Sequence, residues 1–273
     1  MNKKPPSWRD TLSHYLESSN EDSRVVACFE HSIIPRIRSR KDLVWLDIGP
    51  GPGTKTVGMY KALLNAGIQV TQAQAIDSDM AWHSEFLSRA KDFAHCFPEA
   101  AQLVLNSTSL HTLTQRRSNT LGLREPNFIT CIHVLYEDSL VRDFGAYLRG
   151  LSSYCAWVVV EAPSSAFWQM RKAINQRLGL NIPLGAERGI REMLIDQNIR
   201  YREDLITGEI CKIRSPDDIE GWLLPFLLGV SRQETDTIDQ QILTALRELV
   251  EQYVAKQNWQ LDVPDIAFHL ENY

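Results

Sequence analysis

The stretch WLDIGPGPG, at residues 45–53, decides the fold. It begins inside a short apolar run, Leu43–Ile48, that is typical of a buried strand, and it ends with three glycines in alternation with two prolines. Glycine leaves the backbone bare, so a ligand at the carboxyl end of the strand can touch the main chain directly. An apolar strand that stops at such a loop predicts the ligand-binding turn of an α/β domain.

The residues after the turn complete a strand–loop–helix–strand unit. Helical spacing of apolar residues predicts a helix over 55–66, closed by Gly67, and the segment 68–77 is expected to form the second strand. A second strand that follows such a helix normally lies parallel to the first.

Helical and strand patterns go on alternating along the rest of the chain. Continuous apolar runs such as 156–160 are typical of strands covered on both faces, as in a parallel sheet. The first forty residues have helical periodicity that Pro35 should end or kink, and the polar segment 107–126 is expected to hold a loop. Further helices are expected at 80–96, 141–151, 167–178, 190–197, 219–228 and 238–256, and strands at 102–105, 127–135, 156–161, 199–205, 210–213 and 266–270.

Two acidic positions accompany the glycines. Asp47 stands two residues before the first glycine, where it either holds a cationic group of a ligand or braces the loop. Asp77 closes the second strand, where a carboxylate accepts hydrogen bonds from ribose hydroxyls. Asp79 is its neighbour and competitor, with capping of the next helix as the plainer role. Because the spacing is G-x-G-x-G and not G-x-G-x-x-G, a nicotinamide dehydrogenase is disfavoured.

Composition narrows the class of protein. With 44% apolar and 23% charged residues, the 273-residue chain is expected to be globular with a large core. A net charge of −5 offers no basic field for nucleic acid, which is not expected as a partner. No leader-like apolar segment and no stretch of about 20 apolar residues occurs, so no membrane association and a cytoplasmic location are predicted. The five cysteines are scattered without C-x-x-C spacing, so no metal site is predicted.

Three stretches together resemble the class I S-adenosylmethionine (SAM)-dependent methyltransferases. They are residues 45–53, Asp77, and FITCIHVLY at residues 128–136. More narrowly, they resemble histamine N-methyltransferase and its relatives, from which the chain differs at His133 and Glu137. The resemblance implies a Rossmann-like sheet, mostly parallel with an antiparallel last strand, that carries N-terminal helices and a helical C-terminal insertion.

The resemblance also implies one methyltransferase domain over residues 1–273. An N-terminal helical lid would span 1–40 and a SAM-binding core 41–162. The remaining part, 163–273, would supply substrate-side elements and the last strands. SAM is the implied cofactor, a small molecule the implied partner, and the oligomeric state is left open.

Site residues follow from the same resemblance. The implied cofactor contacts are Asp47, Gly49, Gly51, Gly53, Asp77, Trp82, Ser107, Thr108 and Ile132. His133, Tyr136 and Glu137 are implied at the reacting end, with Asp22, His133 and Tyr136 toward the substrate. Trp168 is a further candidate for lining the substrate pocket.

Each of these residues also has a plainer structural interpretation. Trp82 and Trp168 would pack in the core, and His133 would be a hydrogen-bonded core histidine. Tyr136 would cap the fourth strand, and Asp22 would favour a helix N-terminus through the macrodipole.

The chemistry implied is methyl transfer to a small molecule. Because the methyl donor is already activated, the protein's main task is to position the acceptor and exclude water, with His133 or Glu137 available to accept a proton. N-methylation of an amine or imidazole is the first hypothesis. The alternatives are O-methylation of a small metabolite, and a SAM-binding cyclase, sensor or scaffold that transfers no methyl group.

Overall fold

The structure is a computed structural model that describes residues 8–40, 42–92, 103–106, 108–115, 124–230, 232–235 and 237–272. The chain divides into two compact units, each assembled from three segments. Unit 1 consists of residues 1–24, 161–184 and 207–265, and unit 2 consists of residues 25–160, 185–206 and 266–273. This division does not test the expectation of a single methyltransferase domain, which stays a prediction.

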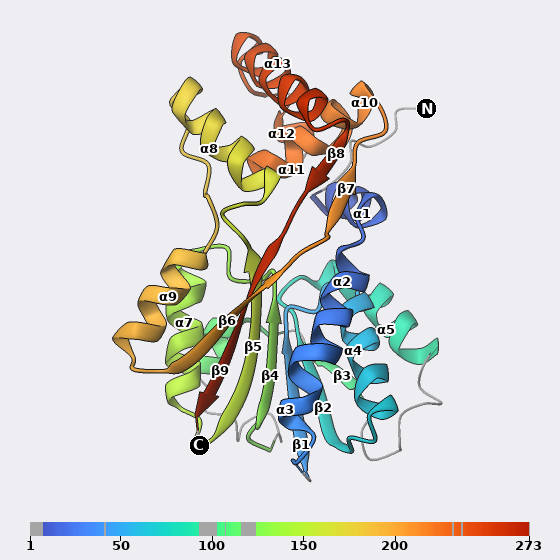
Figure 1. The fold of residues 1–273 in the computed structure, drawn as a ribbon, viewed down its shortest axis with the longest axis vertical. Helices are drawn as coiled ribbons and strands as arrows, with labels where there is room; N and C mark the ends of the chain where they lie inside the picture. Colours follow the sequence, from blue (N-terminus) through green and yellow to red (C-terminus); the bar gives the residue numbers. More distant parts are fainter. Residues whose placement is uncertain are drawn as a thin grey trace. The chain divides into compact units, whose positions relative to one another are not determined.

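Unit 2 is built on a sheet in the order β3-β2-β1-β4-β5-β9-β6. The strands β1 to β5 pair in parallel, and β9 runs in the opposite direction beside β5 (Figure 1). This confirms the predicted fold class of a mostly parallel sheet whose last strand is antiparallel. The bounds are β1 Leu43–Ile48, β2 Val70–Ile76, β3 Leu103–Asn106, β4 Phe128–Ile132, β5 Tyr154–Glu161, β6 Arg200–Ile206 and β9 Asp265–Asn272.

Helices cover both faces of this sheet. One core contains Phe29, Tyr60 and Phe86 from the helices together with Trp45 and Trp157 from the strands. The helical elements on this face are α2 (Glu21–Cys28), η1 (Phe29–Ile33), α3 (Ile34–Ile37), α4 (Thr54–Asn65) and α5 (His83–Asp92), which follows the short 3-10 helix η2 (Met80–Trp82).

The alternate residues of the same strands face the other way. Ile129, Cys131 and Val158 are buried outside that core, as the two-residue period of a strand requires for a sheet covered on both faces. Arg191 of α9 (Glu187–Asp196) lies over the ring of Phe268 in β9, and α9 packs against α7 (Asp138–Arg149), which also contacts α6 (Leu110–Gln115). The prediction that the continuous apolar runs are strands buried on both faces is therefore confirmed.

Unit 1 has its own core of helices and a small antiparallel sheet. Strands β7 (Ile210–Lys212) and β8 (Gln260–Asp262) pair so that Cys211 lies opposite Leu261. Its helical elements are α1 (Trp8–Ser18), α8 (Ala166–Leu178), α10 (Pro216–Asp218), η6 (Ile219–Leu223), α11 (Leu224–Leu228), α12 (Arg232–Thr235) and α13 (Gln240–Lys256). Aromatic contacts fill the centre, where Tyr15 stacks on Phe226 with ring centroids 4.8 Å apart.

Two π-helical turns, each just before a proline, modify the expected helices. The turn Phe29–Ile33 precedes Pro35, and the turn Ile219–Leu223 precedes Pro225. A proline ring clashes with the carbonyl four residues earlier, and a wider i→i+5 turn accommodates that carbonyl without ending the helix. Pro35 thus alters the helix as predicted, one turn earlier than its position suggests.

Three sequence-based expectations differ from the structure. The segment 107–126 contains a helix that was not expected, α6, which Leu110 and Leu113 anchor in the core. Strand β4 ends at Ile132 and not at residue 135, because the next residue has a left-handed backbone. The strand β8 was not predicted, since three residues are too few for a recognisable alternation.

Within the part of the chain that the structure describes, no helix is both long and apolar enough to cross a membrane.

Candidate functional site

The glycine turn after β1 is a left-handed backbone held at both ends. Gly49, Gly51 and Gly53 have φ values of 67°, 55° and 83°. The amide of Gly49 donates to the carbonyl of Ile76 in β2 at 2.8 Å, and the amide of Gly53 donates to the carbonyl of Pro50 at 3.0 Å. Residues with a side chain rarely adopt such φ values, so the turn needs glycine at all three positions.

Two of the three glycines are also required by packing. A β-carbon on Gly49 would lie 2.3 Å from Val134, and one on Gly53 would lie 2.6 Å from the ring of Phe86. A β-carbon on Gly51 would meet no atom of the described residues within 4 Å. Gly51 therefore presents bare backbone to open space, which is the arrangement that a ligand lying on the turn requires.

Asp47 braces the turn from inside the protein. Its two carboxylate oxygens accept hydrogen bonds from the hydroxyls of Thr130 at 2.7 Å and Thr56 at 2.5 Å, and Trp45 donates to the Thr130 hydroxyl at 2.8 Å. Only 3% of Asp47 is exposed. Burial raises the pKa of its carboxyl to about 6 against the opposing effect of the two hydroxyls. Of the two roles predicted for Asp47, this geometry favours bracing over direct contact with a ligand.

Asp77 connects the end of β2 to the glycine turn. Its carboxylate accepts the amide of Gly51 at 3.1 Å and the amide of Asp79 at 2.8 Å. Partial burial raises the pKa of Asp77, and the two backbone amides oppose the rise. A carboxylate has about four lone-pair sites, so these two bonds leave about two for a ligand.

Asp79 has a local role. Its carboxylate accepts the amide of Ala81 at 2.9 Å and so caps the short helix η2. The competitor to Asp77 is therefore committed to a helix terminus, as its position before Met80 suggested.

The end of β4 beside the turn is strained at His133. This residue has a φ of 54°, and its amide donates to the carbonyl of Val159 in β5 at 2.9 Å. A side-chain-bearing residue in this conformation costs about 1–3 kcal/mol, and such residues concentrate at functional sites. The two residues that follow the tight turn at Val134 and Leu135, namely Tyr136 and Glu137, are exposed.

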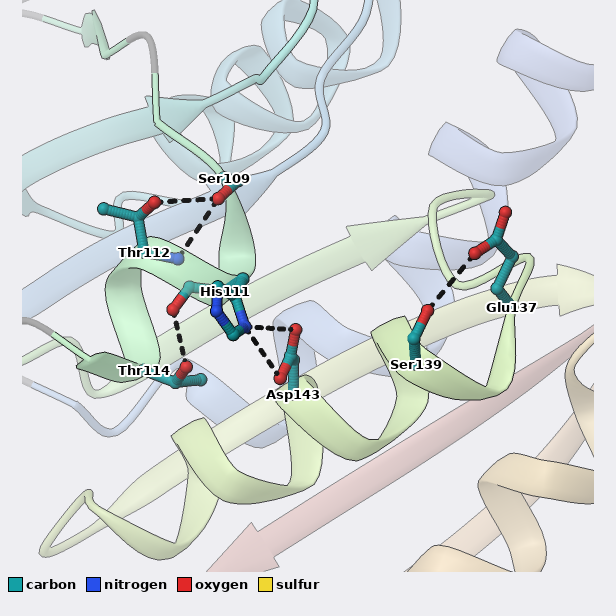
Figure 2. A network of polar contacts seen from close by, with 7 residues as sticks. All are labelled: Ser109, His111, Thr112, Thr114, Glu137, Ser139 and Asp143. Atoms are coloured by element: carbon teal, nitrogen blue, oxygen red, sulfur yellow. Dashed lines mark hydrogen bonds and ion pairs between the residues drawn. The ribbon is translucent and has the colours of Figure 1, made fainter.

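Polar contacts near the start of α7 separate into two groups, which Figure 2 shows. At the beginning of the helix, Ser139 donates its hydroxyl to Glu137 at 3.2 Å. Farther along, Asp143 lies 3.2 Å from Nδ1 of His111 and so joins α7 to α6. Ser109 caps α6 by accepting the amide of Thr112 at 3.1 Å. The His111–Asp143 pair therefore fixes α6, while Glu137 stands apart from it.

The other predicted cofactor residues lie at or after the ends of β2, β3 and β4 in the sequence and differ in exposure. Trp82 in η2 is 5% exposed, and Ile132 at the end of β4 is part of the core. Thr108 is half-buried in the segment between β3 and α6, and Ser107 lies outside the described residues. Their contacts with a cofactor stay predictions.

Two predicted substrate residues belong to unit 1 and not to unit 2. Asp22 occupies the first turn of α2, where a carboxylate also favours the helix macrodipole. Trp168 in α8 is half-buried, with the ammonium of Lys172 5.2 Å from its ring centroid. Their roles toward a substrate stay predictions.

Sequence reasoning missed the two threonines that hold Asp47. Thr56 stands in the first turn of α4, and Thr130 is a polar residue at the centre of an otherwise apolar strand. That isolated hydroxyl was the available signal, because a buried polar group needs a partner. Its partner follows from the register of β4 on β1, in which Asp47 lies opposite Thr130.

Comparisons with known proteins identify the architecture. No family model and no curated protein matches the sequence. The structure resembles magnesium protoporphyrin IX methyltransferase from Synechocystis PCC 6803 with bound SAH at a TM-score of 0.52 and 12% identity, covering 95% of this chain and 86% of that one. The fold is that of class I methyltransferases.

Two further solved structures agree. The cyclopropane-fatty-acyl-phospholipid synthase-like protein from Lactobacillus casei ATCC 334 has a TM-score of 0.53 and 11% identity, with 92% of each chain covered. Loganic acid methyltransferase with SAH has a TM-score of 0.51 and 8% identity, covering 98% of this chain and 96% of that one. At such identities the likeness concerns the fold, and the narrower resemblance to histamine N-methyltransferases stays a prediction.

Proposed function

We propose that this protein is a SAM-dependent methyltransferase that acts on a small molecule, with a nitrogen of an amine or imidazole as the acceptor. The observation that carries the proposal is the pairing of Asp77 with the open backbone of Gly51 at the carboxyl edge of the sheet. Ligands of open α/β sheets bind at this edge, beside the point where the strand order reverses. In this chain that point is β1, flanked by β2 and β4.

The residues present fit the cofactor. The bare Gly51 backbone suits close approach of a ligand, and the remaining lone pairs of Asp77 suit the two hydroxyls of a ribose. Asp47 would hold the turn in shape from beneath, since its oxygens are already bonded to Thr56 and Thr130. Trp82 and Ser107 or Thr108 are the proposed adenine-side contacts, and Ile132 is a further proposed cofactor contact. Two of the solved structures with the same fold contain bound SAH, which supports the same ligand class here.

The residues after β4 are the proposed reacting end. When bound, SAM supplies a methyl group on a sulfonium, which is already an activated electrophile. The protein must then align an acceptor lone pair with that methyl group and exclude water, and good alignment lowers such barriers by about 7–11 kcal/mol. His133, whose backbone is strained, follows directly after the carboxyl end of β4, and it or Glu137 would accept the acceptor's proton. Tyr136 would face the cationic group, and Asp22 and Trp168 are proposed substrate contacts.

The proposal is tested by incubating the purified protein with methyl-labelled SAM and matched acceptors. Each amine or imidazole is paired with the alcohol or carboxylic acid of the same skeleton, and labelled product is separated by chromatography. Label in an amine or imidazole supports N-methylation. Label only in the oxygen analogues would show that the protein is an O-methyltransferase. Saturable binding of SAM without transfer to any acceptor would leave a binding protein, and absence of SAM binding would overturn the proposal altogether.

A further inference from the structure

A pocket of about 320 Å³ with charged side chains in its lining is found in unit 2, separate from the glycine turn. Its volume is at the lower end of the range of about 300–1,000 Å³ that small-ligand sites occupy. The α3 helix on one of its sides leads into the amino end of β1, whereas Gly49 follows the carboxyl end of that strand. The pocket is lined by His31, Ser32, Pro35, Arg36, Arg202 and Asp204.

The acidic residue of the pocket is already occupied by basic neighbours. One oxygen of Asp204 accepts Nε and Nη2 of Arg202 at 3.0 Å and 2.7 Å. The other oxygen lies 2.9 Å from Nε2 of the buried His269. The carboxylate therefore positions Arg202 through one oxygen and faces His269 with the other.

Both arginines of the pocket, Arg36 and Arg202, have guanidinium N–H groups that could donate to a ligand. Arg36 donates Nε to the carbonyl of Ser32 at 3.0 Å, and its Nη1 lies 3.7 Å from Glu271. Within the described residues, these contacts leave Nη2 of Arg36 and Nη1 of Arg202 available, since a guanidinium has five N–H groups. The side chain of Arg202 is 61% exposed, so a ligand from solvent can reach it.

The charges of both arginines also act on the buried His269. Burial is the main cause that lowers the pKa of His269, and the charges of Arg36 and Arg202 lower the pKa further, against the effect of Asp204. Both guanidiniums thus act on one buried point behind the pocket. On the wall itself, His31 uses Nδ1 for the carbonyl of Ala27 at 2.8 Å, which leaves Nε2 for another contact.

We propose that this pocket binds a small anion bearing phosphate or carboxylate groups, held between Arg36 and Arg202. Guanidinium groups match both kinds of oxyanion with paired, charge-assisted hydrogen bonds. The site would be distinct from the one at the glycine turn, so it does not depend on the proposed methyl transfer.

Calorimetric titration of the intact protein with pyrophosphate and, separately, with citrate tests the proposal. Both are run at constant ionic strength with saturating SAH, so that the glycine turn cannot account for binding. We expect saturable binding of at least one anion, weakened about tenfold or more in Arg202→Gln and in Arg36→Gln, because each removes a charge-assisted contact. Preference for pyrophosphate would identify a phosphate ligand, and preference for citrate a carboxylate ligand.

Arg188→Gln is the matched control. It removes the same charge from an exposed position on α9, where Arg188 contacts only Glu192 among the described residues, and it should leave affinity within about twofold. Circular dichroism checks folding, and Arg202→Gln suffices if Arg36→Gln fails to fold. Absence of saturable binding to the native protein, or equal weakening by Arg188→Gln, would overturn the proposal.

Discussion

Gly49 and Val134 are in direct contact, so closely that a β-carbon on Gly49 would lie 2.3 Å from Cγ2 of Val134. The contact joins the turn after β1 to the segment after the neighbouring strand β4. The backbone that would carry a cofactor and the residues that would meet an acceptor are therefore packed against each other.

Replacement of Gly49 by alanine should destabilise the protein more than the same change at Gly51. At Gly49 the added methyl group meets both a left-handed backbone, costing about 1–2 kcal/mol, and an overlap costing about 1–3 kcal/mol. At Gly51 only the backbone cost applies. Urea unfolding measures both, and Val134→Ala should recover part of the loss in Gly49→Ala only. Equal losses at the two glycines would contradict this account.

Asp47 should make stability depend on pH in an unusual direction for a carboxylate. Its pKa rises from 3.8 to about 6 on folding, so the folded protein binds the extra proton between these values and loses stability as pH rises through them. Relative to Asp47→Asn, the native protein should lose roughly 2 kcal/mol between pH 4 and pH 7. Denaturant titrations at each pH give this difference, and a constant difference would refute the assignment.

Asp77 and Asp79 should separate in their effects, although only one residue lies between them. Asp77→Ala removes the carboxylate that faces the Gly51 amide, and we expect SAM affinity to fall by about 1–3 kcal/mol, or roughly 5- to 150-fold. Asp79→Ala removes a helix cap, which costs about 0.5–2 kcal/mol of stability with little effect on affinity. Calorimetry with SAM and thermal unfolding distinguish them. Unchanged affinity in Asp77→Ala would remove this residue from the cofactor site.

His133 offers a test of backbone strain that is independent of its side chain. Both His133→Gly and His133→Ala lose the imidazole, but only alanine retains the cost of a φ of 54°. We therefore expect the glycine variant to be more stable than the alanine variant by about 1 kcal/mol, the reverse of the usual order outside turns. Turnover should fall in both variants alike. A more stable alanine variant would mean that the left-handed conformation is not maintained in solution.

The parts of the site that follow one another in the sequence could be predicted. The apolar run before Gly49 and the acid at the end of the second strand are local patterns, and they correctly indicated the order of β1, α4 and β2. The sheet order beyond them follows the fold class that these patterns suggested.

The remaining features depend on contacts between distant residues. The bonds from Asp47 to Thr56 and Thr130 depend on strand register, which no local pattern contains. The apolar residues Val134 and Leu135 continue the pattern of β4, so the turn at His133 was hidden. The polar segment around α6 concealed a helix in which Leu110 and Leu113 are buried among polar neighbours in the sequence.

The construction of unit 1 affects how the chain acquires its structure. Tyr15 shares a core with Leu249 and Val263, which the ribosome adds almost a whole chain length later. The apolar face of α1 therefore stays exposed to solvent while the strands of the intervening sheet are synthesised. Contacts between residues so far apart in the sequence slow folding, and the exposed apolar surface can aggregate with other molecules. We therefore expect nascent chains of this protein to rely on chaperones until α13 has emerged.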